Sequence, residues 1–183
     1  MLKDKRMLNK VFDNVYLFQP SHSRASIKNN IFKKHDPSKM FEELNYEDLD
    51  EVMERIRGTD AKETNVIIFD DQSAYLKNKE TLRLFKELIF NRRHLRTSIY
   101  FLNQTFFSVP KELRRLFSNI FVFKVSRNEM KNLFEEVVEQ DHVKELMPQI
   151  SKLVFDKPYQ YLFINTDSQK FYKGFDRIDF AED

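Results

Sequence analysis

The 183-residue sequence contains no cysteine, no tryptophan and only two glycines. Without cysteine, the chain has no disulfide framework and no thiolate metal site. It also lacks an apolar run of the roughly 18 residues that a membrane-spanning helix needs. Nothing in it resembles a signal peptide. These absences predict a soluble, intracellular protein.

An excess of charge of one sign is also missing. The formal net charge is only +2, from 31 basic and 29 acidic residues, so bulk charge does not by itself indicate a nucleic-acid partner. Hydrophobic residues make up 41% of the chain and charged residues 33%, which is typical of a globular protein. The length suits one domain with a substantial core, and we expect a single domain over residues 1–183.

Short apolar runs alternate with segments of helical spacing. The apolar runs predict buried strands at residues 15–18, 66–69, 98–102 and 120–125. The helical segments lie at residues 44–57, 78–89, 110–117 and 126–139. A further helix over 141–153 and a hairpin around the turn at 166–169 complete the chain. This alternation predicts an α/β fold with a mostly parallel sheet and helices on both faces.

Polar side chains follow three of the predicted strands. Gln19 follows the first, Asp70 and Asp71 follow the second, and Asn103 and Gln104 follow the third. Because the carboxyl ends of parallel strands meet at one edge of a sheet, we expect these side chains to lie together.

Two adjacent aspartates at the end of a buried strand repel each other unless a partner holds them. A Walker B element has this form: one carboxylate holds Mg²⁺ and the next polarises the water that attacks the γ-phosphate. The alternative is that Asp70 and Asp71 end a strand and begin a turn, where aspartate is common.

Three arginines, Arg92, Arg93 and Arg96, precede the strand predicted at 98–102. An arginine at this place can reach into a neighbouring subunit and stabilise the charge of a transition state. The alternative is a basic helix end that complements the helix dipole. The residues alone leave both interpretations open.

Four segments in order resemble the viral genome-packaging ATPases of the FtsK–HerA superfamily, found in large DNA viruses of eukaryotes. The segments are V-Y-L-F-Q-P-S, V-I-I-F-D-D, N-R-R-H-L-R-T-S-I-Y-F-L-N-Q-T and V-P-K-E-L-R-R. In that family the Walker B strand ends in two acids, an Arg-His pair precedes the next strand, and that strand ends in a sensor glutamine. The resemblance covers residues 12–140 and implies a P-loop NTPase fold of the ASCE type.

The resemblance implies a role for each matching residue. Asp70 would hold Mg²⁺, Asp71 would be the catalytic acid, and Gln104 would be the sensor. Arg92 or Arg93 would be the arginine finger. ATP and Mg²⁺ are the implied cofactors.

Family membership also implies partners. They are double-stranded DNA, capsid components and further subunits of a homo-oligomeric ring, in the host cytoplasm or at a virus assembly site. Lys111, Arg114 and Arg115 are candidate DNA contacts, with a solvated helix face as the alternative. Asn103 is a candidate contact to the nucleotide.

The family's phosphate-binding loop, G-x-x-x-x-G-K-[ST], is absent from these residues. Gly58 and Gly174 are the only glycines, and neither precedes a Lys-Ser or Lys-Thr pair. We therefore expect the chain to begin inside the helix that follows this loop. In the family the loop's strand lies between the equivalents of 98–102 and 120–125. Without it, these two strands either pair directly or leave unpaired edges.

The preferred interpretation is a fragment of a packaging ATPase, with a core over 1–140 and a helix and hairpin over 141–183. Such a chain alone is expected to hydrolyse no ATP, because nothing holds the phosphates beside Asp70 and Asp71. The alternatives are a non-catalytic subunit that assembles with a separate P-loop chain, an inactive relic, and a metal-dependent nuclease.

Overall fold

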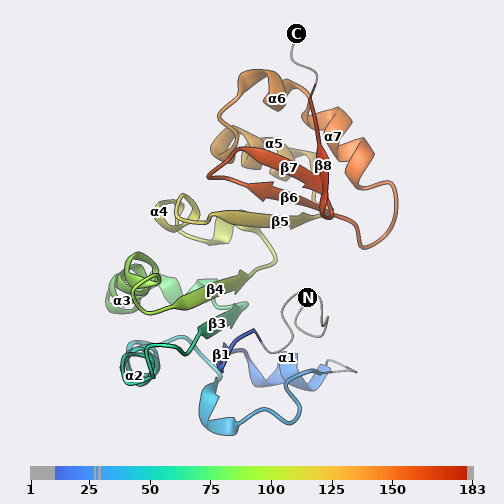
Figure 1. Ribbon diagram of the computed structural model, residues 1–183. Helices are drawn as coiled ribbons and strands as arrows, with labels where there is room; N and C mark the ends of the chain where they lie inside the picture. Colours follow the sequence, from blue (N-terminus) through green and yellow to red (C-terminus); the bar gives the residue numbers. More distant parts are fainter. Residues whose placement is uncertain (1–10, 27, 29, 181–183) are drawn as a thin grey trace. The chain divides into compact units, whose positions relative to one another are not determined.

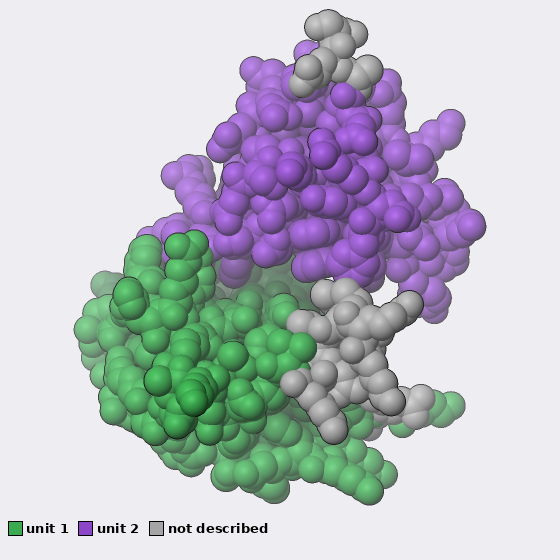
Figure 2. All heavy atoms as spheres, viewed as in Figure 1, with its two compact units in different colours: residues 1–110 green, residues 111–183 purple. Residues whose placement is uncertain are grey.

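The computed structural model describes residues 11–26, 28 and 30–180. The chain divides into two compact units, residues 1–110 and 111–183 (Figure 2). Each unit contains its own four-stranded sheet (Figure 1). The expected single domain, with an ATPase core ending at residue 140, stays a prediction.

The sheet of the first unit is parallel throughout, with strand order β2-β1-β3-β4. Its strands are β1 (Asn14–Phe18), β2 (Met40–Phe41), β3 (Asn65–Asp70) and β4 (Thr97–Leu102). The sheet confirms the α/β fold and the three strands predicted for this region. Strand β2 escaped prediction because two residues are too few to show a pattern.

Two helices, α2 (Tyr46–Arg57) and α3 (Lys79–Asn91), lie side by side against the sheet (Figure 1). Both begin at an asparagine cap, where the side chain satisfies backbone N–H groups of the first turn. Asn45 accepts from the N–H of Asp48 at 2.8 Å, and Asn78 accepts from the N–H groups of Glu80 and Thr81. The shorter elements are α1 (Ser21–Ser26), η1 (Pro37–Lys39), η2 (Ser73–Lys77) and η3 (Phe106–Ser108).

Phe69 is the centre of the core between the sheet and these helices. Its ring stacks on Phe18 at 5.0 Å and meets Phe85 of α3 edge-on at 5.0 Å. The opposite face of the sheet packs a second cluster, in which Phe32 and Met40 cover Leu17 and its neighbours. Because both faces are covered, β3 is buried along its length and reads as a continuous apolar run.

The second unit contains an antiparallel sheet in the order β5-β6-β7-β8. Its strands are β5 (Asn119–Phe123), β6 (Tyr161–Asn165), β7 (Lys170–Lys173) and β8 (Asp176–Ile178). Its helices are α4 (Lys111–Arg114), α5 (Arg127–Val137), α6 (Asp141–Glu145) and α7 (Met147–Val154). The predicted C-terminal hairpin is therefore confirmed, with β8 as an additional strand.

The fourth predicted strand needs a correction, because β5 does not extend the parallel sheet. All five of its residues pair antiparallel with β6. Its side chains alternate between two apolar faces: Ile120 and Val122 are buried, while Phe121 joins a stacked aromatic row with Phe163 at 4.7 Å. Since both faces are apolar, β5 has the continuous pattern of a parallel strand despite its antiparallel pairing.

Strands β4 and β5 do not pair with each other. In the described part of the chain, β4 has β3 as its neighbour and β5 has β6, so each is an end strand of its sheet. Of the two outcomes expected without a P-loop strand, unpaired edges are the one found. The expected end of the preceding helix, at residues 1–10, lies outside the described residues. No helix among the described residues is long and apolar enough to cross a membrane.

Candidate active site

The two aspartates lie at the carboxyl end of β3, the central strand of the parallel sheet. Asp70 is the last residue of β3, and Asp71 has a left-handed backbone conformation with φ of 57°. The N–H of Asp71 donates to the carbonyl of Leu102 at 3.0 Å, so the pairing between β3 and β4 continues one residue past the end of β3. Aspartate tolerates this conformation better than most residues with a Cβ atom.

Gln19 and Gln104 hold one aspartate each. Gln19 follows β1, and its Nε2 donates to Oδ2 of Asp70 at 2.6 Å. Gln104 follows β4, and its Nε2 donates to Oδ2 of Asp71 at 3.2 Å. The ends of three parallel strands thus meet at one edge, as the sequence predicted.

Asn103 is turned away from the acids, although it comes directly before Gln104. Its Nδ2 donates to the carbonyl of Thr105 at 2.8 Å and to the hydroxyl of Ser108. These bonds close the turn after β4. The structure therefore separates the two candidate amides: Gln104 contacts the acid pair and Asn103 shapes the turn.

Gln72 was not singled out from the sequence, yet it is fully buried directly after the acid pair. Its Oε1 accepts from the N–H of Leu44 at 2.8 Å, and its Nε2 donates to the carbonyls of Asp70 and Glu42. These bonds tie the turn after β3 to the segment before α2. The sequence signal available for Gln72 was its position, two residues after a buried strand.

The donor set at this edge fits Mg²⁺, which prefers oxygen ligands and retains several waters when one or two carboxylates bind it. Asp70 and Asp71 supply carboxylate oxygens, and the buried Oε1 of Gln19 has no hydrogen-bond partner in the part of the chain that the structure describes. Among the described residues, no group of three or more histidine, aspartate or glutamate side chains is arranged to hold a metal ion. The site thus suits a metal that is bound partly by water and phosphate.

The candidate arginine fingers lie at the other end of β4. Arg92 ends α3, and its guanidinium donates to the carbonyl of Ile89 at 2.8 Å. Arg93 is exposed, and its guanidinium makes no hydrogen bond or ion pair with any described residue. Since β4 spans six residues, at about 3.3 Å each, these arginines stand a full strand length from the acids of their own chain.

Arg96 has a structural role next to these two arginines. Its guanidinium donates to the carbonyls of Glu63 and Asp60, at 3.0 and 2.9 Å. It thereby holds the loop that leads into β3.

The three candidate DNA contacts differ in exposure. Lys111 and Arg115 are exposed, whereas Arg114 is only 8% exposed and forms an ion pair with Glu136 at 3.2 Å. A DNA contact by Arg114 would require this buried pair to open, and a buried carboxylate without its partner is costly. Arg114 is therefore better explained as a residue that anchors α4 to α5.

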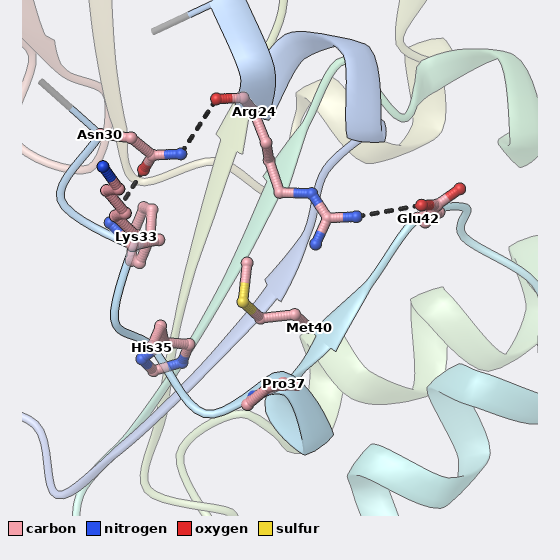
Figure 3. Close-up of a pocket in the computed structure, with 8 residues that line it drawn as sticks. Arg24, Asn30, Lys33, His35, Pro37, Met40 and Glu42 are labelled. Atoms are coloured by element: carbon pink, nitrogen blue, oxygen red, sulfur yellow. Dashed lines mark hydrogen bonds and ion pairs between the residues drawn. The ribbon is translucent and has the colours of Figure 1, made fainter. Parts of the chain in front are cut away.

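A pocket of about 480 Å³ lies beside strand β2 (Figure 3). Arg24 and Glu42 face each other across it as an ion pair at 3.2 Å, and Asn30 donates to the carbonyl of Arg24. Phe32 and Met40 belong both to its lining and to the apolar cluster on the sheet. Neither aspartate of the acid pair lines this pocket, so it is a separate feature.

A sequence profile of the poxvirus A32 protein family matches residues 3–179, nearly the whole chain. The chain belongs to this family. The match confirms the resemblance to viral genome-packaging ATPases that the strand-end motifs indicated. A search among curated proteins found no match.

Solved structures with the same fold come from archaeal viruses. The genome packaging NTPase B204 of Sulfolobus turreted icosahedral virus 2, in complex with AMPPCP, superposes with a TM-score of 0.64 at 13% identity. That match covers 92% of this chain and 84% of B204. The DNA-packaging ATPase B204 of Sulfolobus turreted icosahedral virus gives 0.61 at 14% identity, over 90% and 83% of the two chains. At these identities the similarity establishes the fold of the A32-family chain, a P-loop NTPase fold.

Proposed function

We propose that this chain supplies the catalytic acids of a genome-packaging ATPase, which couples ATP hydrolysis to the threading of viral double-stranded DNA into a capsid. The observation that carries the proposal is the meeting of Asp70, Asp71 and Gln104 at the carboxyl edge of a parallel sheet. Membership of the A32 family and the fold shared with B204, whose structures include ATP analogues, support the same reading.

Each residue at the edge has a defined task in this proposal. Asp70 would hold Mg²⁺, which when bound would supply positive charge to neutralise the ATP phosphates. Asp71, which is exposed and has a left-handed backbone conformation, would orient and polarise the attacking water. Gln104 links this water to the γ-phosphate, and its bond to Asp71 places its amide beside the acid.

Arg93 is the better candidate for the arginine finger. The guanidinium of Arg92 already donates to the carbonyl of Ile89 in α3, whereas that of Arg93 is exposed and has no partner among the described residues. The strand length between Arg93 and its own acids means that it acts on a neighbouring subunit, which requires an oligomer.

The phosphate-binding loop must come from outside these 183 residues, because the chain contains no G-x-x-x-x-G-K-[ST] sequence. The unpaired edge of β4 is a place where a strand that carries this loop would pair. Such a strand belongs either to a further segment of the same polypeptide or to a separate chain. The 183-residue chain alone is therefore expected to hydrolyse no ATP.

The partner of this motor is proposed to be duplex DNA, contacted by Lys111 and Arg115. Both side chains are exposed, Lys111 at the start of α4 and Arg115 directly after it. Contacts of this kind bind phosphates without reading sequence, so their removal weakens binding and lowers its dependence on salt concentration.

The test is to purify the packaging assembly that contains a tagged copy of this chain and to measure its DNA-stimulated ATPase activity. Asp71→Asn is expected to lower turnover at least about 100-fold, the usual effect of losing a general base. Asp167→Asn is the matched control, because Asp167 is exposed in the turn between β6 and β7. The isolated chain serves as the negative control.

Two results contradict the proposal. One is an assembly whose ATPase activity is the same with Asp71→Asn as with Asp167→Asn. The other is ATP hydrolysis by the isolated chain that Asp71→Asn abolishes, which would show that the chain needs no further phosphate-binding loop.

A further inference from the structure

Gln19 is a buried polar side chain of the first unit in which only one of the two polar atoms forms a hydrogen bond. It is 3% exposed at the end of β1. Its Nε2 donates to Oδ2 of Asp70 at 2.6 Å, and its buried Oε1 has no hydrogen-bond partner among the described residues. A buried acceptor without a partner lowers stability, so this amide is poorly explained as a device for stability.

Gln72 is the natural comparison, since it is the same residue type, is buried beside the same strand and also contacts Asp70. Its Oε1 and Nε2 are both bonded, to the N–H of Leu44 and to the carbonyls of Asp70 and Glu42. Gln72 touches only the backbone of Asp70. Gln19 instead touches the carboxylate.

The backbone fixes the position of Gln19 firmly. Its N–H donates to the carbonyl of Phe41 at 2.9 Å, which extends the β1–β2 pairing by one residue. Phe18 is paired with Phe69, so the next residues along the two strands, Gln19 and Asp70, stand opposite each other. Pro20 follows and restricts Gln19 to an extended conformation. The amide is thus aimed at the carboxylate before any ligand arrives.

We propose that Gln19 is a positioning residue for the metal ligand Asp70, an inference that rests on the proposed function. A carboxylate only accepts hydrogen bonds, so the amide nitrogen of Gln19 occupies Oδ2 and directs Oδ1 toward the metal side of the edge. Partners that orient a ligating carboxylate are part of how a protein tunes metal affinity. The buried Oε1 without a hydrogen-bond partner lowers the stability of the fold, and this loss accompanies the positioning role of Gln19.

The experiment measures two quantities on the full chain: Mn²⁺ affinity, by electron paramagnetic resonance titration, and the thermal midpoint. Gln19→Met replaces the amide by an apolar side chain of similar length. The Mn²⁺ dissociation constant is expected to rise about tenfold. The thermal midpoint is expected to fall less than in Gln72→Met, because removal of the unpaired buried acceptor offsets part of the loss of the bond to Asp70. Gln72→Met, the matched control, is expected to lower the midpoint because it breaks satisfied bonds.

The outcomes separate this inference from the proposed function. Unchanged Mn²⁺ affinity in Gln19→Met, or a midpoint lowered as much as in Gln72→Met, overturns the positioning role and leaves the metal site standing. Asp70→Asn tests the site itself and is expected to abolish saturable binding. If Asp70→Asn binds as tightly as the unmodified chain, or the unmodified chain shows no saturable binding, the metal site fails and the role of Gln19 fails with it.

Discussion

Replacing Asp71, the proposed catalytic acid, by glycine is expected to relieve backbone strain, because the backbone at this position is unfavourable for residues with a Cβ atom. Its φ is 57°, where the Cβ of an L-residue crowds the following carbonyl at a cost of roughly 1–2 kcal/mol. Strain of this kind tends to be retained where function requires a particular side chain. Glycine avoids the crowding but loses about 0.5–1 kcal/mol more backbone entropy on folding.

The comparison that isolates the backbone is Asp71→Gly against Asp71→Val. Both variants lose the carboxylate and its 3.2 Å bond with Gln104, so these terms cancel. Asp71 is exposed, so valine gains little from burial there. In the valine variant, crowding of the Cβ atom costs about 2 kcal/mol. In the glycine variant, the extra backbone entropy lost on folding costs about 1 kcal/mol. The glycine variant is therefore expected to be more stable by about 1 kcal/mol.

The assay is urea unfolding followed by far-ultraviolet circular dichroism, because the chain has no tryptophan to report by fluorescence. With a urea slope of about 2 kcal/mol/M, the expected difference separates the two midpoints by about 0.5 M. Equal midpoints, or a valine variant more stable than the glycine variant, would refute the argument from backbone strain.

Three further predictions follow from particular contacts. Phe69→Ala is expected to destabilise the first unit by about 3–5 kcal/mol, measured by urea unfolding, because Phe69 is fully buried among aromatic rings; a loss below about 1 kcal/mol would contradict this packing. In the packaging assembly, Arg93→Ala is expected to lower ATPase turnover about 1,000-fold and Arg92→Ala far less; the reverse order would assign the finger to Arg92. The backbone N–H of Thr64 holds the pKa of Asp13 below its ordinary 3.8. Asp13 therefore contributes stability above pH 3.8, and this contribution is lost as the pH falls through the lowered pKa. Asp13→Asn should therefore reduce the drop in thermal midpoint between pH 5 and pH 3, and an unchanged drop would show that other groups cause it.

Local patterns predicted much of the first unit. Continuous apolar runs marked β1, β3 and β4, and Asn78 marked the start of α3. These signals are reliable because each depends on residues close together in the chain: a cap bonds within one turn, and a strand buried on both faces is apolar throughout. The pattern failed for β5, whose two faces are both apolar for a different reason.

The candidate site was predictable to the extent that its residues follow strands. Asp70, Asp71 and Gln104 each occur where a strand ends, and parallel pairing brings them to one edge. Gln19 was expected at this edge, but its burial and its bond to Asp70 were not predicted, and Gln72 was not singled out at all. A glutamine after a strand reveals neither its burial nor its partners. The burial of Arg114 against Glu136 was hidden for the same reason.

The sequence by itself determined which residues form the parallel strands, which polar groups follow them, and that these residues contain no phosphate-binding loop. Those properties depend on residue type and on neighbours along the chain. Only the tertiary structure decided that Gln19 holds Asp70, that Gln104 rather than Asn103 reaches Asp71, and that β4 and β5 are end strands of two separate sheets. Each of these depends on the register between strands that are distant in sequence, and local patterns carry no record of it.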